Sequence, residues 1–164
     1  GGRQQRTEPR YGHIYDHFAV DFEYPSGARV LSMCRQIQGT ASHVGEHFIG
    51  TAGRADAAGA IHGLKAWRHE APEQPVSPVV QEHTDLVAAL RAGRPYNELK
   101  RIAESTLTAI MGREAAYTGQ VVTWEEALNA EQELGPPDVA FGPLEVPPVA
   151  VPGRTPLSRG WNEG

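Results

Sequence analysis

The chain has 164 residues, which is the size of one ordinary domain and long enough to bury a hydrophobic core. Hydrophobic residues make up 40% of it and charged residues 21%, a globular composition without the run of ~18 apolar residues that a membrane span needs. The formal net charge is -5, so we expect neither nucleic acid nor a membrane as a partner. The single cysteine, Cys34, excludes an intrachain disulfide framework and a cysteine-based zinc site.

Residues 1–70 have the alternating pattern of β-strands. From His17 to Tyr24 apolar and polar residues alternate with a period of two, which predicts a half-buried strand. Pro25–Gly27 predicts a turn, and the alternation resumes over Ala28–Gln36, so the two segments should form a hairpin. We expect Cys34 on the buried side of the second strand, as a small inert hydrophobe. Further strands are predicted at Val44–Thr51 and Ala60–Trp67, with an edge strand at Gly2–Thr7.

The hydrophobic period then becomes helical. Apolar residues recur every three or four positions over Val79–Gly93, which predicts a helix that ends at this glycine. A second helix is predicted over Asn97–Thr118, with its first residue as N-cap and Gly119 as left-handed terminator. Thr123–Gln132 begins with the pattern of a capping box and predicts a short third helix.

Strands followed by helices indicate an α+β fold, with an open, mainly antiparallel sheet and helices packed on one face. We assign residues 1–133 to this domain. Residues 134–164 contain seven of the 13 prolines and form an extended arm, for which a loose tail is favoured over docking through its spaced leucine and valine residues. The uncovered face of such a sheet must be solvated, bind a ligand or meet another subunit.

The motifs of several enzyme classes are absent. Neither of the glycine-rich phosphate loops, Gly-x-Gly-x-x-Gly and Gly-x4-Gly-Lys-Ser/Thr, nor the serine elbow Gly-x-Ser-x-Gly occurs in the chain. Seven histidines are many for this length. The pairs His13/His17 and His43/His47 would each lie about 13 Å apart along a strand, too far to share one ion, although cross-strand pairing would unite one from each. We expect histidines that hydrogen-bond or line a polar pocket, and no metal site.

Polar side chains crowd the start of the predicted sheet. Such groups hydrogen-bond the hydroxyls of a polyol and pair with a carboxylate or phosphate. Strand alternation would place His13, Tyr15 and His17 on one face, and Asp16 on the same side as Phe18. A solvated sheet face or a salt-bridged subunit interface would explain the composition equally well. The candidates for substrate contact are Arg6, His13, Tyr15, Asp16, His17, Arg35 and Gln36.

Six segments have sequences typical of one enzyme family: Gly1–Thr7, Tyr11–Phe18, Tyr24–Gly27, Met33–Gln36, Ala103–Gly119 and Val122–Trp124. Together they resemble the C-terminal half of the Gfo/Idh/MocA oxidoreductases, the family of glucose-fructose oxidoreductase and inositol dehydrogenase, and in particular a bacterial subgroup of dehydrogenases. The resemblance covers about residues 1–150 and depends on the combination of segments.

The resemblance implies a two-domain enzyme. An N-terminal Rossmann domain would bind NAD or NADP, and this chain would be the C-terminal domain, whose open sheet face usually mediates oligomerisation. The usual reaction of the family is hydride transfer at a sugar or polyol carbon. The nucleotide loop, the catalytic lysine segment and the histidine helix of the family would precede Gly1. We therefore assign no catalytic, cofactor-binding or metal-binding residue to this chain.

We predict the substrate-binding and oligomerisation domain of an NAD(P)-dependent oxidoreductase acting on a sugar or polyol, a homo-oligomer that binds no cofactor and catalyses nothing on its own. The alternative from another class is a free-standing α+β binding or assembly module without a cofactor. A third is an NAD-dependent glycoside hydrolase of the same family, in which substrate is cleaved after transient oxidation. The sequence assigns no compartment, and both a cytoplasmic and an exported protein fit it.

Overall fold

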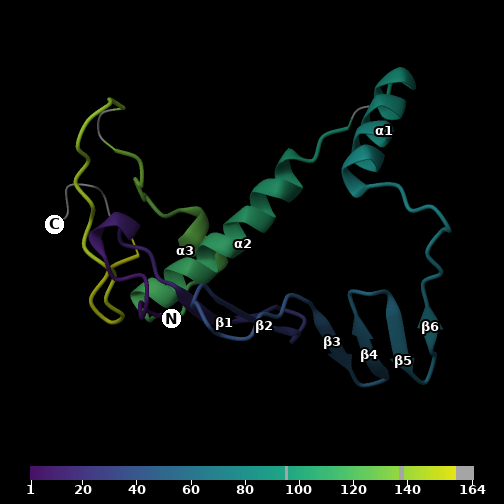
Figure 1. Ribbon diagram of the computed structural model, residues 1–164, viewed down its shortest axis with the longest axis horizontal. Coiled ribbons are helices and arrows are strands. Elements are labelled where there is room, and N and C mark those ends of the chain that lie inside the picture. Colours follow the sequence, from purple (N-terminus) through teal and green to yellow (C-terminus); the bar gives the residue numbers. More distant parts are fainter. Residues whose placement is uncertain (95, 137–138, 158–164) are drawn as a thin grey trace. The chain divides into compact units, whose positions relative to one another are not determined.

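The computed structural model describes residues 1–94, 96–136 and 139–157, and in them it has the α+β class that the element order predicts (Figure 1). These residues form six strands in two open antiparallel sheets, three α-helices and a short 3-10 helix, η1 (Pro9–Tyr11). Contacts divide the chain into two compact units, the first made of Gly1–Gly39 with Glu98–Gly164 and the second of Thr40–Asn97. None of the helices described is both long and apolar enough to cross a membrane.

The first unit is built on a hairpin of β1 (His17–Glu23) and β2 (Arg29–Arg35). The turn between them includes Gly27, whose φ of 80° lies in the left-handed region that glycine adopts without steric cost. The predicted hairpin is thus confirmed, with Phe18 opposite Cys34 in its register. The predicted edge strand before it is wrong, because residues 2–7 contribute only one isolated bridge to β1.

Helix α2 (Leu99–Thr118) packs against β1 (Figure 1). Gly112 on this helix is buried, and a Cβ there would lie 2.7 Å from the Phe22 ring, so the absence of a side chain permits the close approach. The helix ends at Gly119, whose φ of 70° and ψ of 19° are left-handed, as predicted. The alternating apolar residues of β1 therefore face a helix.

Strand β2 is exposed along its whole length, which corrects the prediction that Cys34 is buried. Among the described helices α2 contacts β1 and not β2, so the β2 side chains on the helix side of the hairpin lack a cover. On the opposite face Leu31 and Met33 are 71% and 76% exposed. Helix α2 therefore covers β1 on one face of the hairpin, and the rest of that face and the opposite face are not covered by a described helix.

Helix α3 (Trp124–Leu128) begins at the predicted capping box. The Thr123 hydroxyl accepts from the Glu126 amide at 3.3 Å, and the Glu126 carboxylate accepts from the Thr123 amide at 2.8 Å. The helix is shorter than predicted. The N-cap of α2 also differs from the prediction, since Glu98 and not Asn97 occupies it.

The core of the first unit is small and joins segments that are far apart in the sequence. Tyr15, Tyr117 and Ala150 form the buried cluster, with Phe18 and Val149 packed against it. The rings of Tyr15 and Tyr117 meet edge to face at 4.6 Å, and the Tyr15 hydroxyl donates to the Ala150 carbonyl at 2.9 Å. The C-terminal arm, favoured as a loose tail, is therefore docked at Val149 and Ala150.

The second unit contains a meander of short strands and helix α1 (Pro78–Arg91), the helix predicted after residue 79. The sequence predicted that this part of the chain adds two strands to the same sheet as the hairpin. The structure has instead a separate sheet of four strands here. Two extra reversals produce it, one at a turn that includes Gly59, whose φ is 83°, and one over residues 64–66. In the described part of this unit only Ala89 is buried. Its strands, paired in sequence order, are β3 (His47–Gly50), β4 (Gly53–Asp56), β5 (Ala60–Gly63) and β6 (Trp67–Arg68).

Candidate functional site

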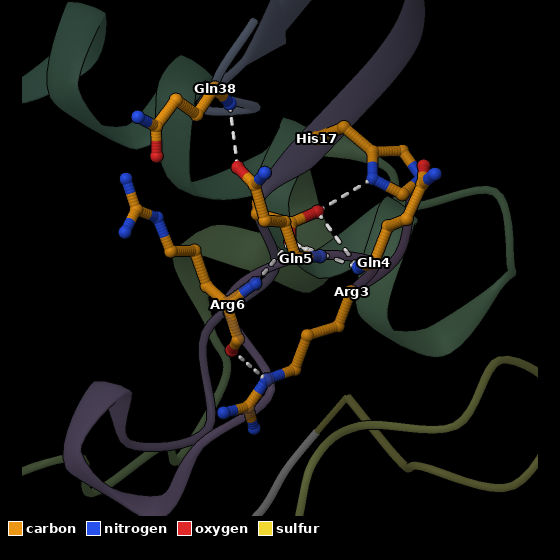
Figure 2. Close-up of polar contacts among 7 residues, drawn as sticks. Arg3, Gln4, Gln5, Arg6, His17 and Gln38 are labelled. Atoms are coloured by element: carbon orange, nitrogen blue, oxygen red, sulfur yellow. Dashed lines mark hydrogen bonds and ion pairs between the residues drawn. The ribbon is translucent and has the colours of Figure 1, made fainter.

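The Asp16 carboxylate gathers three backbone amides of the N-terminal loop. Figure 2 labels the residues that donate them, Gln4, Gln5 and Arg6. Its Oδ2 accepts from Gln4 N at 2.9 Å, from Gln5 N at 2.6 Å and from Arg6 N at 2.9 Å. The Asp16 side chain has no exposed surface. We refer to this carboxylate and its three amides as the Asp16 cradle.

The cradle keeps Asp16 ionised. The hydrogen bond from the Arg6 amide, helped by those from His17, Gln5 and Gln4, lowers the pKa of the Asp16 carboxyl far below its usual value, against the burial that raises it. A carboxylate that is buried and already accepts several hydrogen bonds has little capacity left for a ligand. Asp16 therefore fixes the shape of the loop over residues 4–6.

The same carboxylate orients the His17 ring. Nδ1 of His17 lies 2.8 Å from Asp16 Oδ1, so this nitrogen carries the proton in the neutral imidazole and Nε2 is left as an acceptor. The His17 side chain is 39% exposed. His17 lies opposite Arg35 in the hairpin register, which puts both side chains on the face turned away from α2. An oriented imidazole and a guanidinium thus share one open sheet face.

The alternation predicted for His13, Tyr15 and His17 does not hold. The strand begins only at His17, and residues 12–16 are turn and irregular structure in which no period of two applies. Tyr15 turns into the core, where its ring lies 5.7 Å from that of Phe18. Asp16 precedes β1, and its carboxylate binds the amides of residues 4–6.

Of the remaining predicted residues, Gln36 and Arg6 bond directly to Asp16. Gln36 donates its amide to the Asp16 carbonyl at 2.7 Å, which brings the end of β2 to the same place. Arg6 contributes its amide to the cradle while its guanidinium reaches Tyr11. His13 is half-buried just after η1. The structure therefore gathers residues 4–6, 16–17 and 35–36, whereas Tyr15 belongs to the core.

Sequence reasoning missed a second buried carboxylate, Glu114 of α2, which is 1% exposed. Arg113 pairs with it at 2.7 Å, and Gln132 donates both to Glu114 Oε2 at 3.1 Å and to the Leu157 carbonyl at 2.9 Å. This network ties the helix to the segment after α3 and to the C-terminal arm. Glu114 is buried and its partners are all within the chain, so this half-buried ion pair has a structural role. The only sequence signal for Glu114 was its place in a predicted helix, directly after Arg113.

The histidines do not assemble into a metal centre in the described residues, where no three His, Cys, Asp or Glu side chains are placed to hold an ion. His43 and His47 stack in parallel at 5.9 Å between ring centroids. His62 Nε2 lies 3.8 Å from Asp56 Oδ2 on the neighbouring strand. These contacts are between exposed side chains of the second unit.

The chain was also compared with known proteins. No family model matches it, and no curated protein and no solved structure matches it either. The Asp16 cradle and the segments that form it are therefore the structural basis for a function.

Proposed function

We propose that this chain is the substrate-binding and oligomerisation domain of an NAD(P)-dependent oxidoreductase that acts on a sugar or polyol, with the dinucleotide-binding domain in another part of the protein. One observation carries the proposal. Three segments of the Gfo/Idh/MocA resemblance, separate in the sequence, meet at Asp16. Its carboxylate accepts from the amides of residues 4–6, and its carbonyl accepts from the amide of Gln36. These contacts hold His17 and Arg35 opposite each other on the open face of the hairpin.

The roles of the predicted site residues follow from their accessibility. His17 Nε2 is an acceptor suited to a ligand hydroxyl, and the Arg35 guanidinium donates to hydroxyl or carboxylate oxygens. Asp16 and Tyr15 are positioning residues in this proposal, because both are buried and engaged within the chain. The nicotinamide of the bound cofactor would supply the hydride chemistry. The residues proposed to contact substrate are Arg6, His13, His17, Arg35 and Gln36.

Oligomerisation is proposed through the open sheet faces. In the second unit one apolar row crosses all four strands, formed in register by Phe48, Ala55, Ile61 and Trp67. Phe48 is 63% exposed and Trp67 is 56% exposed. A contiguous exposed apolar row is typical of a surface that contacts another protein. We propose that a second copy of the chain covers it.

The same apolar row favours the second candidate function, an assembly module without a cofactor. The two candidates make opposite predictions for the longest reading frame that contains this chain. An oxidoreductase reduces NAD or NADP in the presence of a sugar or polyol, whereas an assembly module only oligomerises.

The test uses that full-length protein with a panel of sugars and polyols and the absorbance of the reduced cofactor as readout. His17→Ala and Arg35→Ala should each lower kcat/KM by roughly tenfold or more, because each removes a polar contact with substrate. Arg154→Ala is the matched control, an exposed arginine of the C-terminal arm. If His17→Ala and Arg35→Ala were as active as Arg154→Ala, the proposed substrate site would be wrong. Oligomers without any cofactor reduction would favour the assembly module.

A further inference from the structure

Two guanidinium groups converge on one phenol at the outside of the N-terminal loop. Arg6 Nη1 lies 3.2 Å from the Tyr11 hydroxyl oxygen, and Arg10 Nη2 lies 3.0 Å from the same oxygen. Both guanidinium carbons also lie over the Tyr11 ring, at 5.1 Å and 4.9 Å from its centroid. Two like charges are therefore held around a single oxygen atom.

The carboxylate of Glu8 balances only one of these two charges. Arg10 pairs with Glu8 twice, Nε to Oε2 at 3.1 Å and Nη2 to Oε1 at 3.2 Å, in an exposed ion pair of small strength. Arg6 pairs with no carboxylate in the described residues, because Asp16 binds only its backbone amide and is already saturated. Like charges this close repel each other unless a counter-ion is present. The cluster is therefore suited to bind an anion.

The loop that carries the cluster is held in place without any ligand. The Asp16 cradle fixes the backbone at Arg6, and η1 closes with a hydrogen bond from the Tyr11 amide to the Glu8 carbonyl at 3.0 Å. Figure 2 shows the Arg3 side chain bent back to the Arg6 carbonyl, so this third guanidinium stabilises the loop itself. A preformed site spends little binding free energy on ordering.

We propose that Arg6, Arg10 and Tyr11 form a binding site for a phosphate group, either inorganic phosphate or a phosphate monoester. Guanidinium groups present planar, paired donors that match phosphate oxygens. The Tyr11 hydroxyl accepts from both arginines, and its own proton is donated to no other residue in the part of the chain described, so it is available as a third donor. Three donor groups match the three terminal oxygens of a monoester, whereas a carboxylate has two. The site shares Arg6 with the proposed substrate contacts. It needs no dinucleotide, so phosphate binding is measured without the proposed oxidoreductase reaction.

The experiment is an NMR titration of the whole chain with potassium phosphate at constant ionic strength and about pH 8, where phosphate is a dianion. Saturable shifts confined to the Arg6 and Arg10 Nε–H groups and the Tyr11 ring are expected. Arg6→Gln and Arg10→Gln should each weaken binding roughly tenfold or more, and Tyr11→Phe less, because a charged donor contributes more than a neutral one. Backbone amide spectra check that each variant stays folded, since the cradle uses only the backbone of Arg6.

Arg154→Gln, which removes an exposed arginine from the C-terminal arm, should bind phosphate as the parent does. A second titration uses glucose 6-phosphate. Tighter binding than that of inorganic phosphate identifies a monoester as the ligand. Acetate at the same ionic strength should bind more weakly than either. Absence of saturable shifts, equal affinity for acetate, or the same loss in Arg154→Gln would overturn the proposal.

Discussion

The two units differ in the sequence separation of the contacts that hold them. In the first unit Tyr15 bonds to Ala150, and the Thr118 carbonyl accepts from Gly153 N at 2.7 Å, so its parts come from both ends of the chain. In the second unit every strand pairs with its neighbour in sequence. Long-range contacts join distant segments into one core in the first unit, whereas no described helix contacts the locally paired strands of the second unit. The first unit is therefore suited to position a site, and the second to offer a surface.

Burial shows the same difference. The first unit buries two tyrosines and two carboxylates, each with internal partners. In the described part of the second unit only Ala89 is buried. A sheet with so little covered surface gains stability when a partner covers it. The proposed oligomerisation supplies such a partner, and the following predictions test the difference between the units.

The largest effect is expected at Tyr117, which is 3% exposed at the centre of the first core. Tyr117→Ala should lower the free energy of unfolding by about 3–5 kcal/mol, the usual cost of truncating a buried aromatic residue. Trp67→Ala is the matched change in the second unit, where the ring is 56% exposed and the loss should be well below that. Urea unfolding of both variants measures the two costs. Equal costs would contradict the distinction between a closed and an open unit.

Next in size is Asp16→Asn, which replaces an acceptor-only carboxylate with an amide in the cradle. Because folding lowers the pKa of the Asp16 carboxyl, its contribution is fully present above the unfolded pKa of about 4 and is lost as the pH falls toward the lower folded value. The variant should be less stable at neutral pH, and its stability should fall less steeply in acid. Unfolding free energies from about pH 2 to 7 measure this, and identical acid slopes for variant and parent would exclude the cradle as the cause.

A smaller effect is expected at Gly112, where α2 approaches β1. Gly112→Leu should destabilise the chain by about 1–3 kcal/mol, because the new side chain meets the Phe22 ring. Ala109→Leu is the control, since Ala109 is an exposed residue of the same helix. Thermal unfolding compares the two. If both variants are equally stable, the helix does not pack on the strand at this position.

The smallest effect is expected at the capping box. Thr123→Ala removes the hydroxyl that accepts from the Glu126 amide and should cost about 1 kcal/mol. It should also raise the pKa of the Glu126 carboxyl, which the Thr123 amide and hydroxyl lower in the intact box. Thr7→Ala, at an exposed position before η1, is the control. NMR titration of the Glu126 side chain checks the direction of the pKa change.

The elements that local chemistry determines were predicted well. The β1–β2 hairpin follows from its alternation and from the turn at Gly27, and α2 and α3 follow from Gly119 and from the Thr123 capping box. The prediction for Cys34 failed because burial depends on which strand a helix covers, and alternation does not contain that information. The C-terminal arm docks through the contact of Ala150 with Tyr15. No hydrophobic period in the arm distinguishes Ala150, so this contact was not predicted.

The candidate site could be predicted in composition but not in geometry. The crowding of polar residues identified Arg6, Asp16 and His17, which the structure brings together. The partners of Asp16 are backbone amides, and every residue other than proline carries one, so no side-chain pattern identifies them. Tyr15 was placed on the wrong side because a period of two applies only once a strand has begun, and β1 begins two residues later.

The central claim, that this chain is the substrate domain of a dinucleotide enzyme, is tested most directly by calorimetric titration of NAD and NADP. The longest reading frame that contains the chain is compared with the 164-residue chain alone. The account predicts saturable binding of one dinucleotide by the longer protein and none by the chain alone. Absence of binding by the longer protein would contradict the oxidoreductase proposal and leave the apolar row of the second unit as the main functional surface.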